Sequence, residues 1–108
     1  MRTHVVIPSF RVTEHIINLI QRMPNWVEKI WVVDDACPDM SGRLVEKSIS
    51  DSRVEVVFLP LNLGVGGAVK TGYAMALAHG ADVVVKLDGD GQMHPEDIEI
   101  LIQPIALG

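Results

Sequence analysis

The sequence contains a single cysteine, Cys37, among its 108 residues. No intrachain disulfide can form, which favours a reducing compartment such as the cytoplasm. Apolar runs are short, and none approaches the roughly 20 residues that a membrane-spanning helix needs. The start, MRTHVVIPSF, lacks the long apolar region and the cleavage site of a signal peptide. These absences predict a soluble, cytoplasmic domain.

Basic residues are also few and scattered. Nine Lys and Arg stand against 14 Asp and Glu, which gives a formal net charge of -5. A nucleic-acid surface needs clustered Lys and Arg, so we expect no nucleic-acid partner. Hydrophobic residues make up 48% of the chain. This composition and this length suit one domain with a real core, and we predict a single domain over residues 1–108.

Four short runs rich in Val and Ile predict β-strands with little alternation of polar and apolar residues. Such runs are typical of strands buried on both faces of a parallel sheet. The predicted strands are residues 4–7, 29–33, 54–58 and 83–87. Helical patterns lie between and after them: residues 13–23 with Thr13 as N-cap, a helix capped by Ser41 that runs to Ile49, a helix from about Gly67 to His79 that Gly80 ends, and a helix from Pro95.

Strand and helix therefore alternate four times along the chain. This alternation predicts an α/β fold with a parallel sheet, right-handed crossovers and helices on both faces. Ligands of such sheets bind beyond the carboxyl ends of the strands. The informative segments are therefore those that follow the strands: PSF, DDACPD, LPLNLGVGG and DGDGQ.

The segment DGDGQ is the strongest candidate for a metal site. Asp88 and Asp90 flank Gly89, so a tight loop can aim both carboxylates at one point, and Gln92 can add an amide oxygen or orient a water. Oxygen ligands suit Mg²⁺ or Mn²⁺, which keep several waters and bind substrate phosphates. The alternative is a solvated turn. The position after an apolar strand, where ligands bind, favours the metal.

Two further strand ends carry candidate nucleotide-binding groups. One carboxylate of Asp34 and Asp35 could accept a hydrogen bond from a nucleobase or a ribose hydroxyl. The alternative is that a strand-end aspartate accepts hydrogen bonds from loop amides. Pro8, Ser9 and Phe10 form a stiff segment whose aromatic ring could line a base pocket, although a lone Phe is more often part of a core.

The glycine-rich segment NLGVGGAVKTG is similar to two phosphate-binding motifs but matches neither. Val69 stands where both the P-loop and the dinucleotide fingerprint require glycine. We therefore expect Gly64, Gly66 and Gly67 to allow a turn and close packing of the next helix against the sheet. Lys70, in the first turns of that helix, could still reach a phosphate or a base.

Taken together, VVIPSF, WVVDDACPD, NLGVGGAVKTGYAMALAHGAD and VVVKLDGDGQMHPEDI resemble the N-terminal half of family 2 glycosyltransferases. The resemblance is greatest to polyprenyl-phosphate (dolichyl-phosphate) sugar transferases. It implies a Rossmann-like fold of the GT-A type, truncated after the fourth strand and its helix. It also implies binding of a nucleotide-diphosphate sugar, either a UDP-sugar or a GDP-sugar.

At the diphosphate, the resemblance implies that Asp88, Asp90 and Gln92 bind the divalent cation, Mg²⁺ or Mn²⁺. A cation there stabilises the negative charge that develops on the β-phosphate as the nucleoside diphosphate departs. The acceptor that attacks the anomeric carbon would be a polyprenyl phosphate or a growing glycan.

At the base, the resemblance implies that Pro8 and Phe10 border the ring and that Asp35, with Asp34, contacts the base or ribose. The chain departs from the family pattern at this end. Arg11 and Val12 stand where the family usually has Asn and Glu, and Ala36 and Cys37 stand where it has Gly and Ser. These departures bear on the identity of the donor base rather than on the fold.

The family's acceptor site and general base would lie beyond Gly108. We therefore expect a donor-binding fragment that is inactive alone, from a protein that could work at the cytoplasmic face of a membrane. Strand 83–87 would lie near an open sheet edge through which copies could associate. Two alternatives are a non-catalytic nucleotide-binding module and a nucleotidyltransferase, although PSFRVTEH is not the glycine-rich, basic loop usual in the latter.

Overall fold

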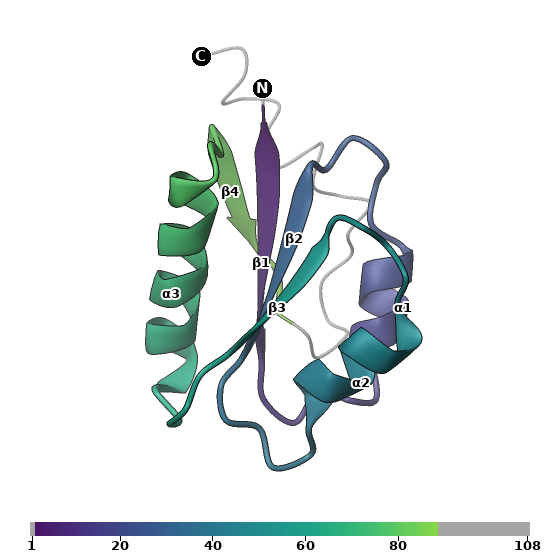
Figure 1. Ribbon diagram of the computed structural model, residues 1–108, viewed down its shortest axis with the longest axis vertical. Coiled ribbons are helices and arrows are strands. Elements are labelled where there is room, and N and C mark those ends of the chain that lie inside the picture. The colour runs from purple at the N-terminus through teal and green to yellow at the C-terminus, as the bar shows by residue number, and fades with distance from the viewer. Residues whose placement is uncertain (1, 89–108) are drawn as a thin grey trace.

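The computed structural model describes residues 2–88, which form a parallel α/β fold (Figure 1). The elements are β1 (Thr3–Ser9), α1 (Ile16–Gln21), β2 (Lys29–Asp34), α2 (Ser41–Ser48), β3 (Val54–Phe58), α3 (Gly64–Ala78) and β4 (Val83–Lys86). All four predicted strands are confirmed, β1 being longer than expected. The predicted helix from Pro95 lies outside the described residues.

The sheet order is β3-β2-β1-β4, and each neighbouring pair is parallel. The chain steps outward from β1 through β2 to β3 and then returns to place β4 on the other side of β1. This reversal creates a switch point between β1 and β4, and open α/β sheets bind their ligands at such points. In register, Ser9 at the end of β1 lies opposite Asp34 at the end of β2.

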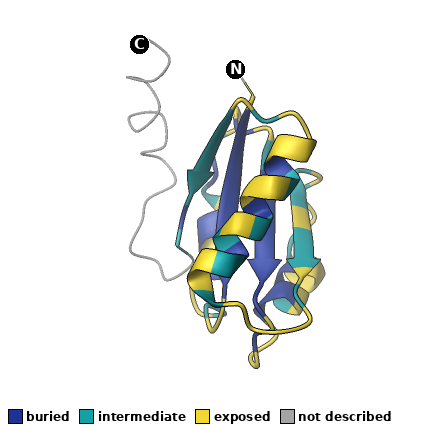
Figure 2. Cartoon of the chain, turned by 90° about the vertical axis from the view of Figure 1, so that its left-hand side faces the viewer, coloured by how far each residue is buried: buried dark blue, intermediate teal, exposed yellow. Residues whose placement is uncertain are grey.

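Helices cover both faces of the sheet, as the alternation predicts (Figure 1). The central strands β1 and β2 are buried, whereas the outer strands β3 and β4 are only partly buried (Figure 2). Successive side chains of β1 point to opposite faces. Val5 and Ile7 therefore join one core cluster and Val6 joins the other.

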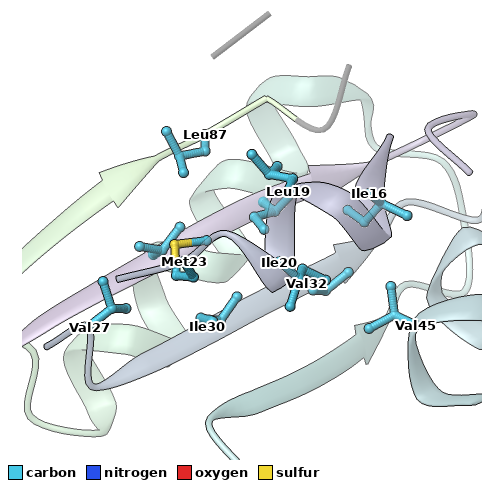
Figure 3. Packing of buried hydrophobic residues seen from close by; sticks show 11 residues of the cluster. Ile16, Leu19, Ile20, Met23, Val27, Ile30, Val32, Val45 and Leu87 are labelled. Atoms are coloured by element: carbon cyan, nitrogen blue, oxygen red, sulfur yellow. The ribbon is translucent and has the colours of Figure 1, made fainter. Parts of the chain in front are cut away.

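The larger cluster lies under α1 and α2 (Figure 3). It consists of Val5, Ile7, Ile16, Leu19, Ile20, Met23, Val27, Ile30, Val32, Val45 and Leu87. The smaller cluster lies under α3 and consists of Val6, Trp31, Val33, Ala68 and Ala76. The two clusters fix the sheet from both sides, so the loops at the carboxyl ends of its strands start from rigid positions.

Helix α3 packs closely on the sheet through small residues spaced four apart. Ala68, Gly72 and Ala76 are its buried residues. A Cβ atom added at Gly72 would lie 2.3 Å from Val6 Cγ1, so only glycine fits there. The prediction that Gly64, Gly66 and Gly67 serve this close approach is wrong.

The helix instead begins at Gly64, earlier than expected, and contains the other two glycines. Gly64 has a φ of +80°, so the predicted turn does occur there. A Cβ atom at Gly66 would meet nothing within 4 Å. A Cβ atom at Gly67 would approach the side chain of Leu63, the N-cap residue of the same helix, and would not approach the sheet.

The predicted end of α3 is confirmed. Gly80 has a φ of +85°. Its N–H donates to the Leu77 carbonyl, and the N–H of Ala81 donates to that of Ala76. This pair of bonds is the Schellman arrangement that satisfies the last carbonyls of a helix.

Both predicted N-caps are wrong. Helix α1 begins at Ile16 with His15 as its N-cap, and Thr13 lies in the turn before it. Helix α2 has Met40 as its N-cap, and Ser41 is its first residue. The Ser41 hydroxyl is 2.6 Å from that of Ser9, so a tertiary hydrogen bond takes the place of a local cap. None of the helices within residues 2–88 combines the length and the apolar character needed to cross a membrane.

Candidate functional site

A cavity of about 190 Å³ opens at the carboxyl ends of the strands. Its walls come from the loops after β1, β2 and β4 and from the first turn of α3, so it lies at the switch point of the sheet. The lining residues are Pro8, Ser9, Phe10, Val12, Asp35, Val65 and Asp88.

The fold therefore brings together five predicted site residues that are up to 80 positions apart in the chain. They are Pro8, Ser9, Phe10, Asp35 and Asp88. Asp34 and Lys70 do not line the cavity, and Lys70 lies exposed on α3. Asp90 and Gln92 lie outside the described residues.

Sequence reasoning missed two lining residues, Val12 and Val65. Val12 was marked only as a departure from the family pattern at the base end, and Val65 carries no group that suggests chemistry. With Pro8 and Phe10 they make part of the cavity lining apolar. An apolar lining suits the flat face of a ring.

Asp34 uses its carboxylate to organise its own loop. Its Oδ1 accepts a hydrogen bond from the Cys37 N–H at 2.8 Å, and its Oδ2 accepts one from the Gly42 N–H at 2.9 Å. The residue is only 4% exposed. This geometry matches the alternative in which a strand-end aspartate binds loop amides.

Asp35 is turned differently. Its Oδ1 accepts a hydrogen bond from the Leu63 N–H at 2.7 Å, which joins the loop after β3 to the loop after β2. Its backbone N–H donates to the Ser9 carbonyl, and its own carbonyl accepts from the Asn62 side chain. Among residues 2–88, Oδ2 has no hydrogen-bond partner. It is therefore available to accept a hydrogen bond in the cavity.

The loops after β1 and β2 hold strained backbone. Arg11, Ala36 and Met40 have φ angles of 56°, 55° and 56°, and they are the only non-glycine residues with positive φ in the described part of the chain. That conformation costs an L-residue roughly 1–2 kcal/mol. Strain of this kind clusters at functional sites, where the surrounding structure holds it in place.

Hydrogen bonds between the two loops hold that strain. The Arg11 N–H donates to the sulfur of Cys37 at 3.0 Å, next to the bond between the hydroxyls of Ser9 and Ser41. Burial raises the pKa of the Cys37 thiol, but hydrogen bonds from the Ser41 side chain and from the backbone N–H groups of Arg11, Ser41 and Asp39 outweigh it and hold the pKa below its ordinary value. A sulfur that accepts several hydrogen bonds is stabilised as the thiolate.

Asp88, which follows β4, is the second carboxylate in the cavity lining. Its Oδ1 lies 3.1 Å from the Nζ atom of Lys86. Carboxylate oxygen is the donor that Mg²⁺ and Mn²⁺ prefer, so the chemistry of Asp88 fits the predicted metal. Residues 2–88 contain no group of three or more His, Cys, Asp or Glu side chains that could hold a metal by themselves.

The sequence model of the family described as "Glycosyl transferase family 2" matches residues 4–107. The chain belongs to this family. The resemblance drawn from the four strand-end motifs is thereby confirmed.

Two curated relatives have names that refer to lipid phosphates. The chain is 32% identical over 108 residues to undecaprenyl-phosphate mannosyltransferase of Micrococcus luteus, covering 97% of this chain and 44% of the relative. It is also 32% identical over 111 residues to polyprenol monophosphomannose synthase of Mycolicibacterium smegmatis, covering 99% and 42%. The chain thus spans less than half the length of these relatives.

The fold is similar to that of S. aureus TarS (residues 1–349), which was crystallised in complex with UDP. The TM-score is 0.73 at 20% identity, over 96% of this chain and 32% of TarS. At that identity the likeness bears on the fold alone. The predicted GT-A type of α/β fold is confirmed.

Proposed function

We propose that the chain is the donor-binding part of a glycosyltransferase that uses a nucleotide-diphosphate sugar, UDP- or GDP-linked. The observation that carries the proposal is the cavity at the switch point, whose lining combines apolar side chains with two carboxylates from different loops. Family membership favours glycosyl transfer over nucleotidyl transfer. The UDP complex of TarS supports a uridine nucleotide as one candidate ligand.

The base and ribose would occupy the part of the cavity next to Pro8, Phe10, Val12 and Val65. Apolar and aromatic side chains contact the faces of a base, and a few polar groups then fix its orientation. Asp35 supplies such a group, since its Oδ2 can accept a hydrogen bond from a base N–H or a ribose hydroxyl. Asp34 has both oxygens engaged by loop amides, so its contribution would be to shape the loop that carries Asp35.

The diphosphate would lie toward Asp88. We propose that Asp88, Asp90 and Gln92 hold Mg²⁺ or Mn²⁺ there, because oxygen donors suit these cations. Bound there, the cation would neutralise the charge that develops on the departing diphosphate. Lys86, already 3.1 Å from Asp88, would keep a second positive charge at this end of the cavity.

The acceptor side of the reaction is proposed from the relatives. Their names indicate transfer to undecaprenyl phosphate and other polyprenol phosphates. We propose that the 108-residue chain alone binds donor but transfers little or no sugar, because it spans less than half the length of these relatives. A cytoplasmic location also stays a prediction.

Calorimetric titration of UDP and GDP, with and without Mn²⁺, tests the proposal. We expect Mn²⁺ to strengthen nucleotide binding and Asp90→Ala to abolish that gain. Glu46→Ala removes a negative charge from the exposed face of α2 and serves as the matched control, with no effect expected. Nucleotide binding that ignores both Mn²⁺ and Asp90→Ala would rule out the metal assignment.

A further inference from the structure

Arg11 carries a positive charge next to Phe10, a residue of the cavity lining. It lies between Phe10 and Val12, which both line the cavity, and its own side chain is exposed. The carbon at the centre of its guanidinium group lies 5.4 Å from the centre of the Phe10 ring. The planar, positively charged guanidinium group therefore lies beside the aromatic ring of Phe10.

Arg11 differs from most basic residues of the described chain in having no acidic partner within residues 2–88. The basic residues paired with carboxylates are Arg2, Lys29, Arg43, Arg53 and Lys86. A contact between a guanidinium group and a ring is worth only about 0.5–1 kcal/mol at an exposed site. It also leaves the five N–H donors of the guanidinium group available to another partner.

The backbone of Arg11 is held in place at an energetic cost. Its φ of 56° would suit glycine better than any L-residue with a long side chain. The bond from its N–H to the Cys37 sulfur fixes this conformation from the neighbouring loop, which also carries Asp35. The backbone of Arg11 is therefore tied to the loop that carries Asp35, next to the cavity.

We propose that Arg11 is a base-recognition residue, whose guanidinium group donates hydrogen bonds to a carbonyl oxygen of the nucleobase lying against Phe10. This inference rests on the proposed function and goes beyond it by naming the group that selects the base. Bases outside a duplex are bound by stacking on aromatic rings and by hydrogen bonds to their edges. Arginine prefers acceptor edges such as O6 and N7 of guanine.

Arg11 and Asp35 together define which bases fit. Arg11 supplies N–H donors, and Asp35 Oδ2 supplies an acceptor. Uracil and guanine each combine a carbonyl oxygen with a ring N–H, which matches this pair. Adenine has no carbonyl oxygen, so the cavity should reject it.

The test is calorimetric titration of the full 108-residue chain with UMP, GMP, AMP, UDP and GDP. Arg11→Ala should weaken binding of the preferred monophosphate and of its diphosphate by the same factor, about tenfold, as expected for a lost guanidinium contact to a base. Lys47→Ala removes an exposed positive charge from α2 and should change neither affinity. AMP should bind most weakly of the three monophosphates.

A second variant separates binding from folding. Arg11→Gly removes the side chain but suits the positive φ, so it should raise the denaturation midpoint while weakening nucleotide binding as much as Arg11→Ala does. If Arg11 had only a structural role, a variant with a higher denaturation midpoint would not bind nucleotide more weakly.

Two results would overturn the role of Arg11 in base recognition and leave the proposed function intact. They are unchanged affinity in Arg11→Ala, and a loss confined to the diphosphates, which would place the contact on phosphate. If the unsubstituted chain binds no nucleotide at all, the proposed function fails as well.

Discussion

Asp34 and Asp35 show how adjacent residues of one type take different roles. The sequence presents them as a pair, and either could have been the ligand-binding acid. Successive side chains at a strand end point in opposite directions. Asp34 is therefore turned to the amides of Cys37 and Gly42, whereas Asp35 faces the cavity. The packing of α2 decides which aspartate binds the loop amides and which faces the cavity, and the sequence does not show that packing.

Cys37 should make the free energy of unfolding depend on pH. Its pKa is lower in the folded chain than in the unfolded chain, so raising the pH ionises the folded state first. The resulting stabilisation is complete above the unfolded pKa, about 8.5, and is lost as the pH falls through the folded pKa. The unfolding free energy of the unsubstituted chain should therefore rise as the pH increases toward the unfolded pKa of the thiol, relative to that of Cys37→Ser, whose hydroxyl does not titrate in this range.

Urea denaturation of both chains at several pH values measures this difference. The serine variant keeps an acceptor for the Arg11 N–H, so it controls for loss of the hydrogen bond itself. A difference in unfolding free energy that stays constant with pH would contradict a thiolate at this position.

Helix α3 illustrates how packing overrides local propensity. Glycine disfavours helix, so the sequence predicts that this helix begins near Gly67. The helix nevertheless begins at Gly64, because its small residues Ala68, Gly72 and Ala76 form a face that packs closely on β1 and β2. Burial of that face stabilises a first turn whose own sequence is unfavourable.

Two glycines of α3 should respond to alanine in opposite ways. Gly72→Ala puts a Cβ atom 2.3 Å from Val6 Cγ1 and should lower the free energy of unfolding by about 1–3 kcal/mol. Gly66→Ala meets nothing within 4 Å and should raise it by about 0.5–1 kcal/mol, because alanine favours helix. Chemical denaturation of both variants is the measurement, and equal effects at the two positions would contradict the close approach at Gly72.

At the scale of the molecule, strand and helix positions were readable but their arrangement in space was not. Valine-rich runs located all four strands, although only β1 and β2 have the burial on both faces that such runs indicate. The place of β4 beside β1 is a non-local choice, and it is what brings Asp88 to the same cavity as Phe10 and Asp35. Val12 and Val65 complete the cavity with apolar side chains, which carry no group that identifies them as cavity residues.

The topology also bears on association between copies. Within the described residues, β4 lies at one end of the sheet and is only partly buried. Its position agrees with the expectation of an open edge near strand 83–87. Association through that edge stays a prediction.

A donor nucleotide, as proposed above, would bind at the switch point between β1 and β4. Titration with UDP or GDP, followed by NMR through the backbone amide signals, tests this binding site. We predict shifts for Phe10, Asp35, Val65 and Asp88, and none for Arg2 and Asp82 at the opposite end of the sheet. Nucleotide-induced shifts that cluster at that opposite end, or no shifts at saturating nucleotide, would contradict it.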